Sequence, residues 1–155
     1  MLIENFGLLL AVNDIQTSRN FYEKILGQKV IMDLGENVAY EGGFSIQVDY
    51  IGIIGEADFK IAYKSNDHEL VTEVEDFGEF VSHLQQFRDI VYVHGVKEYP
   101  WLQRVIRFYD PDFHIIEVGE SMGSIFKKLF GQRMNIQEIA KKTQHPVEYV
   151  KKFLS

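Results

Sequence analysis

The sequence contains no cysteine, only three prolines and one tryptophan. The absence of cysteine excludes disulfides, thiolate zinc sites, iron–sulfur clusters and cysteine nucleophiles. No apolar run approaches the roughly 20 residues that span a bilayer. The first residues, Met1-Leu2-Ile3-Glu4-Asn5, also lack the basic segment of a signal peptide. We therefore expect a cytoplasmic protein that does not associate with membranes.

Several motifs that carry chemistry are also missing. The sequence has no His-x-x-x-His, Gly-x-Gly-x-x-Gly or Walker loop, which disfavours nucleotide-binding enzymes. What is present is an ordinary globular composition, with 46% hydrophobic and 25% charged residues in 155 residues, the length of one domain.

The charge is unevenly distributed along the chain. The overall net charge of −7 disfavours nucleic acid as a partner. Residues 1–120 carry 9 basic and 21 acidic residues, a net charge of −12, whereas residues 121–155 carry 7 and 2, a net charge of +5. We therefore predict a domain over residues 1–120 and a basic helical extension over residues 121–155.

The acidic part contains an internal repeat. A predicted strand over 8–14 and helix over 15–26 recur 62 residues later as a strand over 70–76 and a helix from 77 to about 87. Three short strands follow each helix, so each half has the order β-α-β-β-β. The fold class is α+β: two modules, at about 6–50 and 68–120, form a cup-shaped mixed sheet, with small C-terminal helices added. Predicted later strands are 29–34, 38–40, 44–50, 90–94, 105–109 and 113–119.

Strand alternation predicts which side chains face the cavity of the cup. If one face of each sheet packs on its helix, the other lines a shared cavity. The repeat then assigns four equivalent inward positions, Gly7, Gln47, Glu69 and Glu117.

Several of these residues resemble a known family. The pattern Val12-Asn13-Asp14, Ser18 and Phe21-Tyr22, with Asp110-Pro111-Asp112 before Ile116-Glu117-Val118, is similar to the glyoxalase, bleomycin-resistance and extradiol dioxygenase superfamily, also called vicinal oxygen chelate. The resemblance covers roughly residues 6–120. It implies a divalent metal held at the inward positions, where bidentate oxygen substrates chelate it, and it implies a homodimer.

The resemblance assigns Gln47, Glu69 and Glu117 as candidate metal ligands, although only Glu117 matches the usual ligand and Gly7 offers no side chain. The candidate cofactor is Mg²⁺, Mn²⁺, Ni²⁺ or Zn²⁺, or none. An oxygen-only donor set suits Mg²⁺, Mn²⁺ or Ca²⁺ better than Zn²⁺. Glu117 is the candidate catalytic residue, as metal ligand or acid and base. The alternative is that the metal has been lost and Glu117 lies in a binding cleft.

A second candidate feature is the aromatic segment 98–103 with the strand that follows. Tyr99 and Trp101 are suited to stack on a flat ligand, and Arg107, which shares strand parity with Tyr109, is suited to bind an anionic group. We assign Tyr99, Trp101, Arg107 and Tyr109 as candidate ligand-binding residues. The same aromatic side chains are equally suited to pack one module or subunit on another.

The basic extension contains three short amphipathic segments, at 124–131, from 135 and from 146. The last two are similar to the two helices of helix-turn-helix proteins, which would allow DNA binding. We favour a helical cap that docks on the acidic body or on a dimer partner, because the body would repel DNA.

These features lead to two main hypotheses of function. The first is a glyoxalase-like lyase or isomerase that acts on a small oxygen-rich substrate in a cup, with or without a bound metal. The alternative is a non-catalytic protein that sequesters a planar or cationic small molecule, as proteins of the bleomycin-resistance type do. A third hypothesis is a ligand-responsive regulator that uses the extension.

Overall fold

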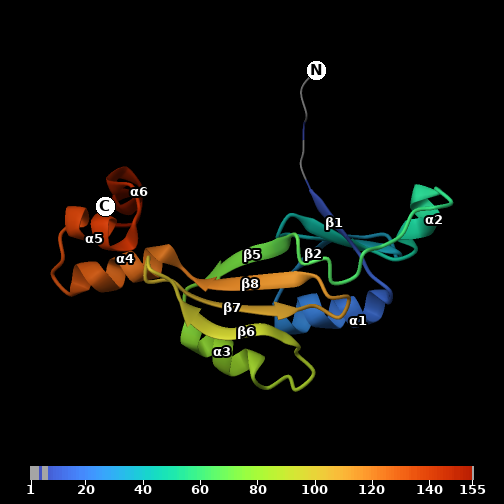
Figure 1. The fold of residues 1–155 in the computed structure, drawn as a ribbon, viewed down its shortest axis with the longest axis horizontal. Helices are drawn as coiled ribbons and strands as arrows, with labels where there is room; N and C mark the ends of the chain where they lie inside the picture. The colour runs from blue at the N-terminus through green and yellow to red at the C-terminus, as the bar shows by residue number, and fades with distance from the viewer. Residues whose placement is uncertain (1–3, 5–6, 155) are drawn as a thin grey trace. The chain divides into compact units, whose positions relative to one another are not determined.

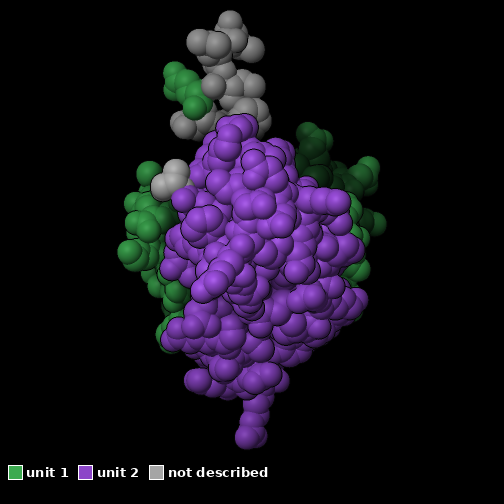
Figure 2. Space-filling view, turned by 90° about the vertical axis from the view of Figure 1, so that its left-hand side faces the viewer, with its two compact units in different colours: residues 1–68, 109–115 green, residues 69–108, 116–155 purple. Residues whose placement is uncertain are grey.

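The structure is a computed structural model that describes residue 4 and residues 7–154. It divides into two compact units, which Figure 2 shows in different colours. The first unit contains residues up to 68 together with 109–115, and the second contains 69–108 and 116–155. No helix in the described part of the chain is long and apolar enough to cross a membrane.

The first unit contains one four-stranded sheet with the order β1-β4-β3-β2 (Figure 1). Strand β1 pairs in parallel with β4, and the other pairs are antiparallel, so the sheet is mixed. The helix after β1 begins at the cap Asp14, whose side chain accepts a hydrogen bond from the Thr17 amide at 2.7 Å. The elements are β1 (Leu8–Ala11), α1 (Ile15–Arg19), the π-helical η1 (Asn20–Ile25), β2 (Val30–Asp33), β3 (Asn37–Tyr40), β4 (Phe44–Gln47) and α2 (Tyr50–Ile54).

The second unit repeats this arrangement. Its sheet has the order β5-β8-β7-β6, the same as the first when the strands are matched along the chain. Helix α3 lies along one face of the sheet (Figure 1), and Phe77 and Leu84 of this helix are fully buried. The elements are β5 (Glu69–Val74), α3 (Phe77–Leu84), β6 (Tyr92–Glu98), β7 (Arg104–Tyr109) and β8 (Ile115–Glu120).

The C-terminal extension also belongs to the second unit. It forms α4 (Met122–Gly131), α5 (Ile136–Thr143) and α6 (Val147–Leu154), which share a core around Phe126 and Ile139, both fully buried. Trp101 and Leu102 pack against this core. The extension is therefore docked on the aromatic segment that precedes β7, within its own unit.

The α+β class and the internal duplication are confirmed, because both sheets have the same strand order and the helices of the extension form as expected. Several predicted bounds were wrong. Strand β6 continues to Glu98, with register shifts against β7, and α3 ends at Leu84. Helix α2 was not predicted. It begins after Asp49, whose left-handed φ of 49° turns the chain out of β4 and whose side chain caps the helix.

Candidate functional site

The most family-like motif residues are structural. Both carboxyl groups of the turn 110–112 are buried. Asp110 accepts hydrogen bonds from the Tyr22 hydroxyl at 2.7 Å and from the His114 amide at 2.8 Å. Asp112 Oδ1 accepts hydrogen bonds from the backbone amide of Asn13 at 3.0 Å and from its side-chain Nδ2 at 2.6 Å. Burial raises the pKa of Asp112, although the hydrogen bonds from Asn13 oppose the shift. These contacts fix the turn to Asn13, just after β1, and to Tyr22 of η1, inside the first unit.

The candidate site lies on the face of the second sheet opposite α3. Ile116 and Val118 are buried, so Glu117 points to the other face, and Arg107 of β7 points the same way between Ile106 and Phe108. Glu69 of β5 and His94 of β6 complete the group. Each of the four strands of the sheet therefore contributes one side chain to this group. We call Glu69, His94, Tyr99, Arg107 and Glu117 the Arg107 cluster.

Arg107 is the centre of the cluster. Its Nε donates to Glu69 Oε2 at 2.8 Å, and Nη2 donates to Glu69 Oε1 at 3.4 Å and is paired with Glu117 Oε2. Its Nη1 donates to the Tyr99 hydroxyl at 2.7 Å and to His94 Nε2 at 3.1 Å. All five N–H groups of the guanidinium thus have an acceptor inside the protein. No donor of Arg107 is left for an anionic ligand.

The protonation of the cluster follows from these contacts. Burial opposes the charge of Arg107, but the hydrogen bonds that Arg107 donates to Glu69 and Tyr99 outweigh this effect and hold the pKa of the guanidinium above its usual value. The His94 Nδ1 lies 2.6 Å from the Gly95 carbonyl oxygen and must donate, which leaves Nε2 as the acceptor facing Arg107. With two carboxylates and one guanidinium, the cluster carries a net charge of −1.

An aromatic pair lies beside the cluster. The rings of Tyr99 and Trp101 are stacked, with their centroids 4.7 Å apart and an angle of 17° between the planes. The Arg107 guanidinium lies 5.8 Å from the centroid of the Tyr99 ring. The Trp101 Nε1 donates to Gln103 Oε1 at 2.9 Å. The structure thus brings three of the four candidate ligand-binding residues together.

The remaining predicted residues lie in the first unit. The Tyr109 hydroxyl donates to Asn66 Oδ1 at 2.7 Å. The Gln47 side chain is buried, accepts from Asn37 Nδ2 at 2.9 Å and donates to the Val48 carbonyl at 2.7 Å. Gly7 is exposed. The Gln47 oxygen that was predicted to bind a metal is therefore already hydrogen-bonded.

The donor set in the second unit does not fit a divalent metal. Glu69 and Glu117, the two carboxylates predicted as ligands, both contact the permanent positive charge of Arg107. A second cation between them would face strong repulsion, since arginine does not lose its proton in proteins. Among the described residues, no three His, Asp or Glu side chains converge to hold a metal ion.

The sequence matches the model of one family. Residues 6–123 match the family described as "Glyoxalase-like domain". The chain belongs to this family. The matched range contains both modules and ends in the first turn of α4, so most of the extension of this glyoxalase-like protein lies outside the family's domain.

Solved structures with similar folds include proteins of several bacteria. A protein of unknown function from Agrobacterium tumefaciens is 30% identical, with a TM-score of 0.68 over 79% of this chain and 97% of that chain. An integron cassette protein from V. cholerae is 25% identical, with a TM-score of 0.53 over 77% and 96%. A lactoylglutathione lyase from Agrobacterium tumefaciens is 16% identical, with a TM-score of 0.54 over 77% and 95%, a likeness of fold alone. No curated protein matches the sequence.

Sequence reasoning missed two features of the second unit. It left the direction of His94 open, because the register shifts in β6 cannot be read from residue types. It also assigned no role to Arg104 and Glu120, which form a bidentate pair at 2.7 and 2.9 Å. Opposite charges on consecutive strands were the available signal for this pair.

Proposed function

We propose that this glyoxalase-like protein binds a small planar cation without a metal. The ligand lies on the face of the second sheet opposite α3, which we call the open face. The observation that carries this proposal is that Arg107 takes the place between Glu69 and Glu117 where a metal would lie. The ligand is then held by the protein's own charges and rings. This is the binding and sequestering alternative among the functions expected from the sequence.

The charge of the open face favours a cation. Strand β5 presents Glu69, Val71 and Glu73 on one face by alternation, and Glu117 lies on the same face of β8. The face therefore carries three carboxylates and one guanidinium, and the N–H groups of the guanidinium are all hydrogen-bonded within the protein. The carboxylate oxygens keep free lone pairs, so the face accepts hydrogen bonds rather than donating them.

The aromatic pair favours a flat ligand. A planar cation gains a stacking and a cation–π contribution on Tyr or Trp, of about 0.5–2 kcal/mol depending on how far it is desolvated. The Tyr99 and Trp101 rings are already stacked on one another and held by hydrogen bonds to Arg107 and Gln103. Little rotamer entropy is then lost when a ligand binds.

Calorimetric titration with benzamidine, a planar cation, tests the proposal. We expect binding that is unchanged after treatment with a chelator and at least about fivefold weaker with benzamide, the neutral analogue of similar shape, because one lost charge contact is worth roughly 1 kcal/mol. Glu69→Gln and Glu117→Gln should each weaken binding similarly. Glu75→Gln, at an exposed position just after β5, is the matched control. Equal binding of benzamide, or loss of binding with chelator, would contradict the proposal.

A lyase or isomerase reaction of the glyoxalase type is the second candidate. It is supported by Glu117, a carboxylate of the residue type that serves as a general base, whose side chain is 13% exposed. Glu117 would take the proton next to a substrate carbonyl and return it to the neighbouring carbon. Conversion of the hemithioacetal of methylglyoxal and glutathione to the thioester, lost in Glu117→Gln, would favour this candidate. We expect no conversion.

A further inference from the structure

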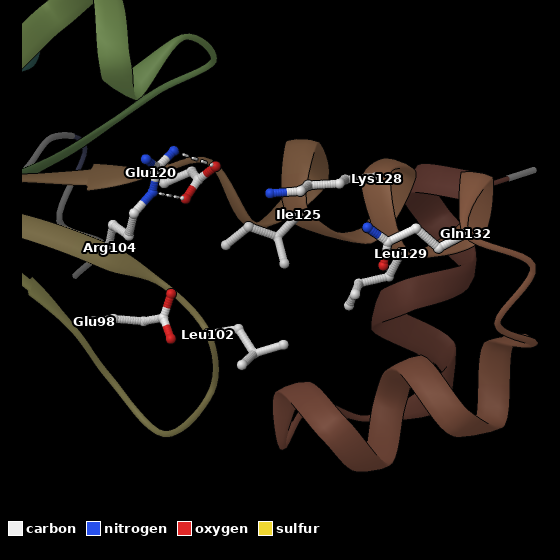
Figure 3. Close-up of a pocket in the computed structure, with 8 residues that line it drawn as sticks. All are labelled: Glu98, Leu102, Arg104, Glu120, Ile125, Lys128, Leu129 and Gln132. Atoms are coloured by element: carbon white, nitrogen blue, oxygen red, sulfur yellow. Dashed lines mark hydrogen bonds and ion pairs between the residues drawn. The ribbon is translucent and has the colours of Figure 1, made fainter.

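A cavity of about 360 Å³ lies in the second unit, where the end of its sheet meets helix α4 (Figure 3). This volume is in the range of small-molecule sites. The cavity shares no lining residue with the Arg107 cluster, because Arg104 and Glu120 have the opposite strand parity to Arg107 and Glu117. Its lining residues are Glu98, Leu102, Arg104, Glu120, Ile125, Lys128, Leu129 and Gln132.

One part of the cavity is apolar. Ile125 and Leu129 of α4 are buried members of the core of the extension, and Leu102 packs against the same core. Leu102 has a φ of 71°, a left-handed conformation that is unfavourable for a bulky residue and is retained only where the surroundings enforce it. The strained backbone places Leu102 at the cavity, opposite α4 in Figure 3.

The polar part contains one closed ion pair and two further charges. Arg104 and Glu120 neutralise each other through two hydrogen bonds. The Glu98 carboxylate and the Lys128 ammonium group extend toward the same cavity in Figure 3. Within the part of the chain that the structure describes, neither Glu98 nor Lys128 forms an ion pair. The cavity thus offers one negative and one positive charge beside an apolar wall.

We propose that this cavity binds a small zwitterion with an apolar body, such as a leucine-like amino acid or a short apolar peptide. The ligand carboxylate pairs with Lys128, the ligand ammonium group pairs with Glu98, and the apolar body covers Ile125 and Leu129. A simple anion would meet repulsion from Glu98, and a simple cation would meet repulsion from Lys128. Only a ligand with both charges satisfies both groups.

The site depends on the extension. Ile125, Lys128, Leu129 and Gln132 all follow residue 123, where the match to the family ends. The proposed site is therefore a feature that this chain adds to a glyoxalase-like domain, and it does not depend on the function proposed for the Arg107 cluster.

The test is calorimetric titration of the full chain with L-leucine and with leucyl-leucine. Isoamylamine and 4-methylpentanoate, which carry one charge each, are the comparison ligands. We expect at least one zwitterion to bind about tenfold or more tightly than either singly charged compound. Whichever zwitterion binds more tightly identifies the source as a free amino acid or a peptide. If neither zwitterion binds, or if the singly charged compounds bind as tightly, the proposal is overturned.

Variants locate the site. Glu98→Gln and Lys128→Gln should each weaken zwitterion binding about tenfold, whereas Lys127→Gln, an exposed neighbour on α4, should leave it unchanged. Glu117→Gln should also leave it unchanged, which separates this site from the Arg107 cluster. Unfolding curves of all variants test whether each variant is folded. If folded Glu98→Gln and Lys128→Gln bind as the wild type does, the proposal is overturned.

Discussion

Arg107 shows at the residue scale why lysine cannot replace arginine in this cluster. Five N–H groups of a planar fork reach Glu69, Glu117, Tyr99 and His94. Lysine has three donors on one atom and cannot span the same acceptors. The side chains of Arg107 and Glu117 are only 20% and 13% exposed, so unpaired groups would be poorly compensated by water.

We expect Arg107→Lys to lower the free energy of unfolding by about 1–3 kcal/mol, because buried acceptors lose their partners. Urea unfolding followed by circular dichroism measures this. The control is Arg88→Lys at an exposed position, which should change stability by less than about 0.5 kcal/mol. Equal stability of the two variants would show that the guanidinium fork is not needed.

The buried residue Tyr40 is expected to make the stability of the protein depend on pH. Its side chain is buried in the first unit, and burial, followed by the nearby charge of Glu23, raises its pKa from 10.0 to about 12. The unfolded chain therefore loses this proton at lower pH than the folded chain. The stability that comes from Tyr40 is complete below pH 10 and is lost as the pH rises through about 12.

The measurement compares urea unfolding of the wild type and Tyr40→Phe at pH 8 and pH 11. Between these values the wild type should lose about 1 kcal/mol more than the variant, because the variant has no hydroxyl to ionise. Other titrating groups are common to both proteins and cancel in the comparison. The same pH dependence in both proteins would mean that Tyr40 titrates normally.

At the scale of elements, the sequence predicted the helices and strands well where hydrophobic periodicity or capping was clear. Helix α5 begins at Ile136, directly after the cap Asn135 that the sequence pattern predicted. Helix α2 was missed because its start depends on a left-handed Asp49, a backbone conformation that residue type does not specify. Alternation placed Glu69 and Glu117 on one face of the second sheet, but it could not place Arg107 between them, because contacts between strands depend on register.

The capping box of α5 gives a testable prediction for the stability of a single helix. The Asn135 side chain accepts from the Glu138 amide at 3.0 Å, and the Glu138 side chain accepts from the Asn135 amide at 2.8 Å. We expect Asn135→Ala to destabilise the protein by about 1 kcal/mol and Asn135→Asp to have little effect, since aspartate keeps the acceptor. Thermal unfolding measures both variants. Equal loss in both would exclude the cap as the cause.

At the scale of the whole molecule, the opposite charges of the two parts of the chain meet within one unit. The extension has a net charge of +5, and its Lys128 lines the same cavity as Glu98 and Glu120 of the glyoxalase-like domain. The apolar sides of α4, α5 and α6 form a common core. This arrangement agrees with the expected helical cap. The expectation that nucleic acid is not a partner stays a prediction.

The outer strand of the first sheet supports the expected homodimer. Strand β2 is the outer strand in the order β1-β4-β3-β2, and Ile31, Met32 and Leu34 in and after it are 63%, 55% and 68% exposed. Such apolar side chains on an outer strand favour a partner surface, because an exposed edge otherwise promotes aggregation. We therefore expect a dimer at micromolar concentration in analytical ultracentrifugation.

A double variant, Ile31→Lys with Leu34→Lys, should raise the dimer dissociation constant at least about tenfold, because burying two charges without partners outweighs the lost apolar contact. Val71→Lys, at a 63% exposed position in the second unit, is the control for the added charge and should leave the dimer intact. A monomeric wild type would contradict the prediction outright. A dimer that resists the double variant but not Val71→Lys would place the interface on the second sheet instead, where it would compete with the ligand proposed for the Arg107 cluster.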